Sequence, residues 1–371
     1  MIYLDYAASS PPYAEVCRLV GETMAKLYAD PGSVHSAAAS AQKILRESRQ
    51  TMAKLLRFPD SCVYFTSGGT ESNNTALISG ALSTGRQEIV VAASEHPSVL
   101  EPVKQLQGLG FRVKYVYPDA DGIIDLGDIE AALSHETALV SVQAVNGETG
   151  AVQNTDEIYR MAHRFGALYH CDAALGFGHF DIFWHNSDMI SLSAHKFGGP
   201  KGVGVLAVKD SVMLEPFLRG GGQEFGLRSG SENVPGIAGM ALAAELSAKE
   251  LTPVFLRIQN MNYYIINTLR EHILEVEIRG EFTPRYPGIL NIRIPGISGE
   301  EMCARLDSKG ICVSPGSSCG VRDNAPSHVL LSMGLSEQQA KESFRISMGR
   351  LTTEEEVETA VKEIIAVASQ K

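Results

Sequence analysis

Between residues 60 and 210 the chain alternates short, almost wholly apolar runs with longer amphipathic segments. The apolar runs are strand candidates, and the amphipathic segments have the period of helices. Strands that are apolar on both faces must be buried on both faces, so this alternation favours a mostly parallel sheet covered by helices. The strand candidates are 63–66, 88–92, 112–116, 138–143, 167–171, 189–192 and 202–208, and the main helix candidates are 97–108, 126–133 and 155–165.

The pattern changes near residue 235, and a long helical stretch covers about 253–273. An extended run at 288–293, a helix at 299–308 and a helix at 352–368 with a capping-box pattern follow. A chain of 371 residues is too long for one small core, so we expect two domains. We place a large domain, with a mostly parallel seven-stranded sheet, at 15–254. A smaller α+β domain would combine 1–14 with 255–371, and the function would lie where the two domains face each other.

Composition narrows the classes of function. The net charge is −11 and no block of like charges stands out, which argues against direct nucleic-acid binding but not against a basic partner protein. The first residues lack the basic and apolar regions of a signal peptide, and no apolar run is long enough to span a bilayer. We therefore expect a cytoplasmic protein without membrane contact. Six scattered cysteines without metal-binding spacing predict free thiols and no metal site.

A glycine-rich segment, Ser67–Asn74, follows one strand candidate and opens a helix candidate. Gly68 and Gly69 let the backbone approach an anion, and the N–H groups at the helix start point toward it. The Thr70 hydroxyl adds a further donor. The segment matches neither the dinucleotide-binding nor the P-loop fingerprint, so an ordinary capped turn remains the alternative to a phosphate site.

A lysine and an aspartate follow two other strand candidates. Lys196 lies directly after a short apolar run, in a loop rich in Gly and Pro, where a desolvated amine can act as a nucleophile. Ser193 and His195 beside it suit a second phosphate-binding cluster. Asp172 ends an apolar run and needs a cationic partner if it is buried. A surface lysine and a helix N-cap are the alternatives, but together the two residues are the pair expected to bind pyridoxal phosphate (PLP).

Four further residues stand at positions suited to chemistry. His96 lies at a strand-to-helix junction, where it can stack on a flat ring and move protons, or simply fill a place near a helix start. Asn146 follows another strand candidate and is otherwise a turn residue. Cys319 lies in a segment of small and polar residues, which favours an accessible thiol. Arg345 within a short strand suits bidentate binding of a carboxylate, with an edge-strand ion pair as the alternative.

These residues belong to a series of motifs that runs along nearly the whole chain: Tyr3–Ala8, Thr66–Asn74, Glu95–His96, Val145–Gly150, His170–Ala173, Ser193–Lys196, Gly220–Glu224, Arg228–Asn233 and Arg345–Arg350. In this order and spacing the motifs resemble those of the NifS/IscS-like cysteine desulfurases, which belong to the class V aminotransferase family of fold-type I PLP enzymes. The resemblance implies L-cysteine as substrate, a protein sulfur acceptor, a homodimer, and a pathway such as iron–sulfur cluster assembly.

The resemblance also implies a role for each cofactor-binding residue. Lys196 would form the Schiff base with PLP, Asp172 would pair with the pyridine nitrogen, and His96 would stack on the ring and serve as acid and base. The phosphate would be bound by residues from both subunits, namely Gly69, Thr70, Ser193 and His195 of one chain and Ser231 of the other.

For the substrate, the resemblance implies three residues. Asn146, which would also contact the cofactor, and Arg345 would hold the carboxylate of L-cysteine. Cys319 would attack the substrate sulfur and become a persulfide, leaving alanine. The thiolate attack is chemically the same as thiol–disulfide exchange, and covalent catalysis divides the difficult C–S cleavage into easier steps.

Three positions depart from the pattern of the family. Leu175 stands where Gln usually bonds the phenolic oxygen of PLP. Asp30 stands where Asn usually lies near the substrate carboxylate, and an ionised Asp30 there would repel it. Phe225 replaces the usual Arg. These changes favour a divergent branch with slower turnover or a specialised acceptor. The alternatives are another class V activity (selenocysteine lyase, cystine or cysteine-sulfinate lyase, aminotransferase) and a binding partner with a degraded site, although a transaminase needs no thiol such as Cys319.

Overall fold

A seven-stranded sheet is the centre of the larger half of the molecule in the computed structural model, which describes residues 1–180, 184, 186–315 and 325–370. The strands are β2 (Val63–Thr66), β3 (Glu88–Ala92), β4 (Arg112–Val116), β5 (Thr137–Ser141), β6 (Leu168–Asp172), β7 (Met189–Ser193) and β8 (Gly204–Val208). Their order is β2-β8-β7-β6-β5-β3-β4. Neighbours from β7 to β4 are parallel, whereas β8 is antiparallel to both β2 and β7. The predicted α/β class with a mostly parallel seven-stranded sheet is confirmed.

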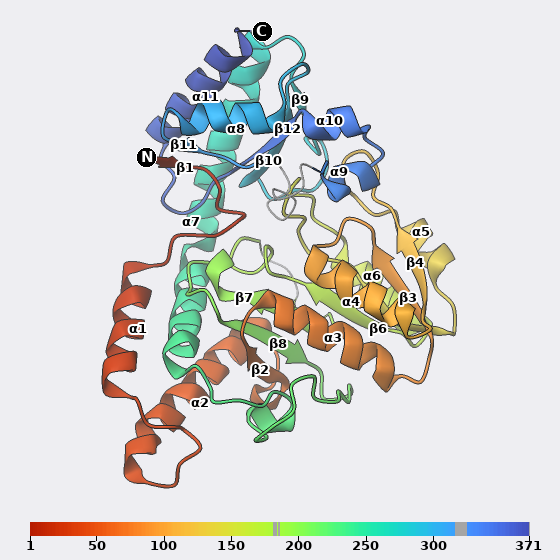
Figure 1. Cartoon of the computed structure of the whole chain (residues 1–371), viewed down its shortest axis with the longest axis vertical. Coiled ribbons are helices and arrows are strands. Elements are labelled where there is room, and N and C mark those ends of the chain that lie inside the picture. Colours follow the sequence, from red (N-terminus) through yellow and green to blue (C-terminus); the bar gives the residue numbers. More distant parts are fainter. Residues whose placement is uncertain (181–183, 185, 316–324, 371) are drawn as a thin grey trace.

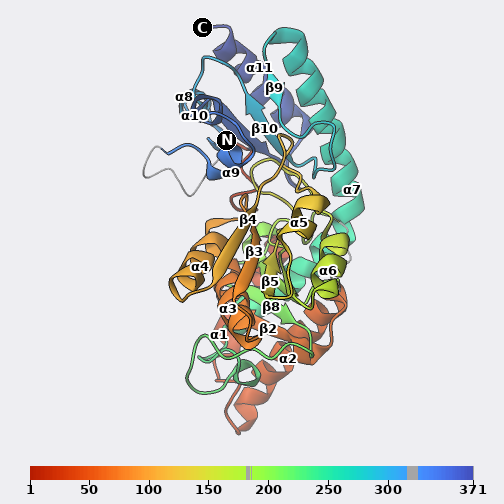
Figure 2. The same cartoon turned by 90° about the vertical axis from the view of Figure 1, so that its right-hand side faces the viewer.

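Helices cover both faces of this sheet, because its strands are apolar on both sides. The helices of this half are α1 (Ala14–Lys26), α2 (Ser36–Leu56), α3 (Gly69–Ser83), α4 (Pro97–Gly108), α5 (Leu126–Ala132) and α6 (Thr155–Arg164). Side chains of α3 and α4 share one buried cluster with Leu139 and Met189, and those of α2 and α6 share another with Val140 and Ile190. Figure 2 shows α4 and α6 on opposite sides of the strands. A Cβ on Gly80 of α3 would lie 2.8 Å from the Met189 side chain, so glycine permits this close approach to β7.

One long helix, α7 (Val234–His272), runs along both halves of the molecule (Figure 1). It packs against α1 and α2 of the larger half and against α11 (Glu354–Ala368) of the smaller half. The sequence predicted this helix only from 253, because Pro253 resembles the proline of a first helical turn. Pro253 instead lies inside α7, and the expected domain boundary at 254/255 falls within this continuous helix. Neither α7 nor any other helix in the described part of the chain is long and apolar enough to cross a membrane.

The smaller half combines two short sheets with helices. β12 (Ser343–Ser347), β10 (Ile289–Arg293) and β9 (Glu277–Ile278) form an antiparallel sheet, and β1 (Ile2–Tyr3) pairs in parallel with β11 (Ile311–Cys312). The helices are α8 (Gly299–Asp307), α9 (His328–Ser332), α10 (Glu337–Lys341) and α11. Short 3-10 turns elsewhere are η1 (Asp60–Cys62), η2 (Ala194–Lys196) and η3 (Glu224–Gly226). The N-terminal strand thus belongs to the smaller half, beside residues from the far end of the chain.

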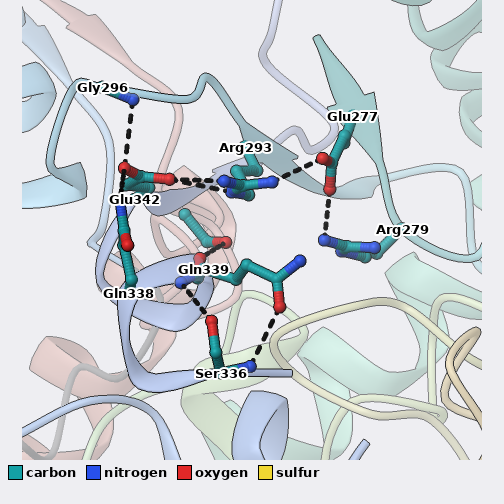
Figure 3. A network of polar contacts seen from close by, with 9 residues as sticks. Glu277, Arg279, Arg293, Gly296, Ser336, Gln338, Gln339 and Glu342 are labelled. Atoms are coloured by element: carbon teal, nitrogen blue, oxygen red, sulfur yellow. Dashed lines mark hydrogen bonds and ion pairs between the residues drawn. The ribbon is translucent and has the colours of Figure 1, made fainter. Parts of the chain in front are cut away.

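A polar network fastens α10 to the sheet of the smaller half (Figure 3). Arg293 of β10 forms ion pairs with Glu277 of β9 on one side and with Glu342 on the other. Glu277 also pairs with Arg279, and Glu342 accepts a hydrogen bond from the Gly296 N–H at 3.1 Å. Glu342 follows α10 directly, and α9 packs against α10. The network therefore holds the α9–α10 segment at a defined place above the larger half.

Candidate active site

A cavity of about 300 Å³ lies where strands of the larger half end and the smaller half begins. Asp172 and Ser193 are the last residues of β6 and β7, and Arg345 of β12 comes from the smaller half. The predicted site residues in the cavity wall are Gly69, Thr70, His96, Asn146, Asp172, Ser193, His195, Lys196 and Arg345. The structure thus brings together residues that are spread over most of the sequence. They meet at the ends of the strands, which is where the sequence predicted the site.

Asp172 is a buried carboxylate from which a chain of hydrogen bonds leads to His96. Asn73 Nδ2 of α3 donates to Asp172 Oδ2 at 2.8 Å, and the Ala174 N–H donates to Asp172 Oδ1 at 3.0 Å. Asn73 Nδ2 also donates to Ser98 Oγ at 2.8 Å, and Ser98 Oγ lies 2.7 Å from His96 Nδ1. Asp172 has no ion pair within the described residues. A buried carboxylate held only by neutral donors suits a cationic group bound in the cavity.

His96 is the N-cap of α4, and its contacts fix its tautomer. The Ser98 N–H donates to His96 Nδ1 at 3.1 Å, so Nδ1 is an acceptor. Neutral His96 therefore carries its proton on Nε2. Burial lowers the pKa of His96; the Asp172 charge opposes this shift, and Lys196 and His328 add to it. Near neutral pH the ring is therefore neutral and donates from Nε2.

The start of α3 and the turn after β7 form one end of the cavity. Gly69 and Thr70 lie in the first turn of α3, where the N–H groups have no partner within the helix. A Cβ on Gly69 would lie 3.4 Å from the Ser193 Cβ, so the start of α3 and the end of β7 lie side by side here. Burial, and after it the charges of neighbouring lysines, lower the pKa of His195 to about 4. Main-chain donors, the hydroxyls of Thr70 and Ser193, and the His195 ring together suit a phosphate group.

The N-terminal segment holds both the amine and the main chain of Lys196. Lys196 Nζ donates to the main-chain oxygens of Ala7 and Ala8 at 2.7 and 3.1 Å. The main-chain oxygen of Lys196 accepts from Ser10 Oγ at 2.6 Å and from His179 Nε2 at 2.9 Å. Sequence reasoning missed the N-terminal partners because no local pattern connects them with a lysine so far along the chain.

Arg345 and Asn146 form the wall on the side of the smaller half. Arg345 Nη1 donates to the Gly147 main-chain oxygen at 2.8 Å, and Nη2 donates to Asp5 Oδ1 at 2.7 Å. Arg345 Nε is buried and has no partner in the described part of the chain. Asn146 Nδ2 donates to the Ser94 main-chain oxygen at 3.1 Å. Gly147 and Asp5 thus hold a guanidinium charge in the cavity wall, and such a group suits a carboxylate ligand.

Three more residues that the sequence did not single out surround this wall. Glu148 lines the cavity and accepts from Ser327 Oγ; burial raises its pKa, and Ser327, His328 and Arg345 oppose the shift. Glu95 is fully buried, and burial and then the Asp172 charge raise its pKa well above the usual value. His328 Nε2 donates to the main-chain oxygen of Glu95 at 2.8 Å. One signal in the sequence could have pointed to His328: Ser327 before it is an N-cap serine that opens a short apolar helix.

Ser231 is a predicted site residue that does not line this cavity. Ser231 is exposed and, with Ser67 and Arg228, lines a separate pocket of about 80 Å³. It is not among the residues that line the cavity around Lys196 in its own chain. Cys319 lies outside the described residues.

The three departures from the family pattern have different surroundings. Leu175 lines the cavity, and its Cδ1 would lie 2.7 Å from a Cβ on Gly147, so the wall is apolar there. Asp30 does not line the cavity of its own chain; its Oδ1 accepts from the Gly32 N–H at 2.7 Å. The expected repulsion of a substrate carboxylate therefore does not arise within one chain. Phe225 is 67% exposed, and the Arg49 guanidinium lies 4.8 Å from its ring centre.

The donor set fits a flat, phosphorylated cofactor with a cationic ring nitrogen, together with a small carboxylate substrate. Asp172 supplies the anion for the ring nitrogen, the start of α3 with Ser193 and His195 supplies the phosphate end, and Arg345 supplies the carboxylate end. Asn73 Oδ1 is buried without a partner among the described residues, so a polar acceptor remains unused beside Asp172. The Lys196 amine can act as a nucleophile toward such a cofactor. His96, at the end of the hydrogen-bond chain from Asp172, can transfer protons to or from an amino-acid substrate.

Comparison with known proteins agrees with this site. Residues 2–359 match the family model for aminotransferase class-V, and the chain belongs to this family. It is 38% identical to cysteine desulfurase IscS 1 of Archaeoglobus fulgidus, over 96% of this chain and 94% of that protein. It is 35% identical to cysteine desulfurase IscS of Dictyoglomus turgidum, over 96% and 91% of the two chains.

Solved structures confirm the fold. A NifS-like protein superposes with a TM-score of 0.92 at 33% identity and covers 100% of both chains. A NifS-like protein from Rickettsia africae superposes with a TM-score of 0.90 at 28% identity and covers 100% of this chain and 99% of that one. The expected resemblance to NifS/IscS-like proteins is therefore confirmed along the whole chain.

Proposed function

We propose that this chain is a PLP-dependent cysteine desulfurase, which moves the sulfur of L-cysteine onto Cys319 and releases L-alanine. The observation that carries the proposal is a single cavity that brings together Lys196, Asp172 and Arg345. An amine, a buried carboxylate and a carboxylate-binding arginine are the groups that a PLP enzyme acting on an amino acid requires. Relatives that cover almost the whole chain are cysteine desulfurases, which supports the same conclusion.

The cavity residues divide between the parts of PLP. Asp172 would pair with the ring nitrogen, Lys196 would hold the carbonyl carbon, and His96 would stack on the ring and exchange protons. The phosphate would be bound by the residues at the start of α3 and after β7, namely Gly69, Thr70, Ser193 and His195. When bound, PLP supplies an electron sink for bond changes at the α-carbon of the substrate.

The protein residues define the substrate and the direction of sulfur transfer. Arg345 and Asn146 bind the carboxylate of L-cysteine. The Cys319 thiolate attacks the substrate sulfur, so that an S–S bond forms while the Cβ–S bond breaks. The electron pair of the broken bond passes to the substrate carbon, which takes up a proton and becomes the methyl group of alanine. The sulfur stays on Cys319 as a persulfide, from which a protein acceptor takes it.

A homodimer belongs to the same proposal, because Ser231 does not line the cavity of its own chain. Large apolar side chains are exposed at and after the end of α1, with Met24 at 68%, Tyr28 at 87% and Val34 at 105% exposure. Contact with a second chain would remove such surface from water. In this arrangement Ser231 of one chain reaches the phosphate in the other. A cytoplasmic role in supplying sulfur, for example to iron–sulfur clusters, is the setting we propose.

The decisive experiment measures alanine formed from L-cysteine by PLP-loaded protein with a reductant. The wild type is compared with Cys319→Ala, and Cys17→Ala serves as the control because Cys17 is an exposed free cysteine outside the cavity. We expect alanine from wild type and from Cys17→Ala, but not from Cys319→Ala. Alanine from all three proteins would show that Cys319 is not required for the reaction. No alanine from any of them would refute the desulfurase function.

A further inference from the structure

An acidic residue, Glu148, lies in the same part of the cavity wall as Arg345. Glu148 lines the cavity and is buried. Arg345 Nη1 donates to the main-chain oxygen of Gly147, the residue directly before Glu148. Burial raises the pKa of Glu148, and the Arg345 charge is among the groups that oppose this shift, so the two side chains lie close enough to act on each other.

The main chain and one carboxylate oxygen of Glu148 are held in place. The Glu148 N–H donates to Asn146 Oδ1 at 2.9 Å, and the Thr149 N–H donates to the same oxygen at 3.0 Å. Ser327 Oγ donates to Glu148 Oε2. Oε1 has no hydrogen-bond partner in the described part of the chain, and it is not among the polar atoms that are sealed from solvent. Because Glu148 lines the cavity, Oε1 can contact a molecule bound there.

Positive charges are few in this cavity. Among the described residues of its wall, Arg345 is the only arginine and Lys196 the only lysine. Arg345 Nη2 already forms an ion pair with Asp5, and the substrate carboxylate adds a second anion to the same guanidinium. Lys196 serves the cofactor in the proposed function. A further anionic group on the substrate would therefore meet the Glu148 charge without a cation of its own.

A small substrate cannot keep such a group away from Glu148. The cavity, of about 300 Å³, would be shared by cofactor and substrate. In an amino acid of the size of cysteine, the sulfur is attached one carbon beyond the α-carbon, close to the carboxylate that Arg345 binds. Leu175, which lies against Gly147, and Val329 add apolar surface to the wall. A thiol suits these surroundings, whereas an anionic group does not.

We propose that Glu148 is a specificity-determining residue, which admits amino acids with an uncharged side chain and excludes those whose side chain is an anion. L-Cysteine, as a thiol, belongs to the first kind, and L-cysteine sulfinate belongs to the second. This role rests on the proposed desulfurase function and narrows its substrate class. It also disfavours the cysteine-sulfinate lyase that remained an alternative from the sequence.

Cysteine sulfinate provides a test that needs no thiol of the protein. When its Cβ–S bond breaks, the electron pair stays on carbon, which takes up a proton and becomes the methyl group of alanine. The sulfur leaves as sulfur dioxide, which water converts to sulfite. No bond to a protein sulfur forms, and no oxidant or reductant takes part. Alanine formed from the sulfinate therefore reports its entry and cleavage independently of Cys319.

The first measurement compares kcat/KM for alanine formation from L-cysteine sulfinate with kcat/KM for L-cysteine. A pH of 7.5 lies below the pKa of the cysteine thiol and well above that of an ordinary carboxyl group. Both substrates carry the same amino and carboxylate groups, so the ratio of sulfinate to cysteine reports the side chain alone. We expect Glu148→Gln to raise this ratio about 100-fold over wild type, because a like charge at short range is removed.

Two further variants make this comparison specific. Glu148→Asp keeps the negative charge and should keep the ratio within about threefold of wild type. Glu101→Gln is the matched control, since Glu101 is an exposed residue of α4 outside the cavity and pairs with Lys104. It removes one carboxylate from the protein but should leave the ratio at the wild-type value.

A second measurement does not depend on turnover. Succinate and butyrate have the same carboxylate and the same number of carbon atoms, but only succinate has a second anionic group, spaced as in cysteine sulfinate. Their dissociation constants are measured by isothermal titration calorimetry with PLP-loaded protein. We expect the wild type to bind butyrate about tenfold more tightly than succinate, and Glu148→Gln to lose this preference. A residue with a purely structural role would change both dissociation constants alike.

The outcomes separate this role from the proposed function. If the wild type forms alanine from L-cysteine and Glu148→Gln keeps the wild-type ratios in both measurements, Glu148 does not determine specificity. A wild type that uses cysteine sulfinate as well as L-cysteine also overturns the inference. If the wild type forms alanine from neither substrate, the desulfurase function fails and the two carboxylates decide alone. A preference for butyrate that Glu148→Gln loses then supports the exclusion of anions, and an unchanged preference overturns it.

Discussion

The buried ion pair between Arg49 of α2 and Glu224 of η3 provides the sharpest test of how the structure is held together. The two guanidinium nitrogens of Arg49 donate to the two Glu224 oxygens at 2.7 and 2.8 Å. Arg49 is 7% exposed and Glu224 is 5% exposed, and Glu224 also accepts the Phe65 N–H at 2.8 Å. Glu224 and Phe225 both have positive φ angles, 49° and 56°, so the pair holds a strained turn in place. We predict that Glu224→Ala strongly destabilises the fold.

The size of this destabilisation follows from the Arg49 charge, which Glu224→Ala leaves buried without a partner. Removing one partner of a buried ion pair leaves the other uncompensated and costs about 3–5 kcal/mol. The unfolding entropy of a chain of this length is about 0.8 kcal/mol per degree, from the usual value per residue, so the melting temperature should fall by about 4–6 °C. Arg49→Met in the same chain removes the stranded charge and keeps the side-chain volume. The double variant should therefore be more stable than Glu224→Ala alone.

Differential scanning calorimetry of the single and double variants measures this effect. Glu215→Ala is the matched control, because Glu215 forms an ion pair with Arg219 in the preceding segment with both side chains exposed, and such pairs contribute little. The reasoning is refuted if Glu224→Ala has the same melting temperature as the control. It is also refuted if the double variant is less stable than Glu224→Ala. Since η3 precedes Ser231 in the same turn region, loss of the pair should also weaken PLP binding in the proposed dimer.

Three other perturbations test individual side chains. Burial lowers the pKa of His170 to about 4 from 6.5, so between these pH values only the unfolded chain binds the extra proton. The contribution of His170 to the free energy of unfolding should thus fall by at most about 1.4 kcal/mol per unit as pH drops from 6.5 to 4, and His170→Gln should reduce the overall slope in urea titrations by this amount. Leu175→Gln places an amide in the apolar cavity wall and should shift the visible absorption maximum of bound PLP. Identical spectra of this variant and the wild type would show that residue 175 does not contact the ring. Arg345→Lys keeps the charge but loses the planar fork, so KM for L-cysteine should rise about tenfold or more, while an unchanged KM would exclude Arg345 from substrate binding.

Local patterns were sufficient for much of the fold. The runs predicted at 63–66, 88–92 and 112–116 are β2, β3 and β4, and the helix predicted at 97–108 is α4. Buried strands of a parallel sheet are short and apolar between Gly, Pro and polar residues, so their limits are visible in the sequence. The first half of α7 was missed because a single proline gives the same local signal at a helix start and inside a long helix whose packing tolerates it.

The site was predictable where chemistry coincides with a strand end. Lys196, Asp172 and His96 each follow an apolar run, and parallel strands bring such positions to one edge. His328 and Glu148 meet only through tertiary contacts between the two halves. The network from Asp172 to His96 through Asn73 and Ser98 likewise depends on how α3 and α4 face each other. No spacing rule along the chain predicts such contacts.

The ion pair between Asp5 and Arg345 sets an order in which the cavity wall can be assembled during synthesis. The two residues are 340 positions apart, and Ala7 and Ala8, which receive the Lys196 amine, belong to the same early segment as Asp5. A ribosome-bound chain that has emerged only as far as β8 contains all strands of the large sheet but not the arginine that Asp5 orients. In such a nascent chain the Asp5 carboxylate lacks its partner in β12, and the Arg345 side of the cavity is missing. The part of the cavity wall that contains Arg345 can therefore form only after β12 has been synthesised.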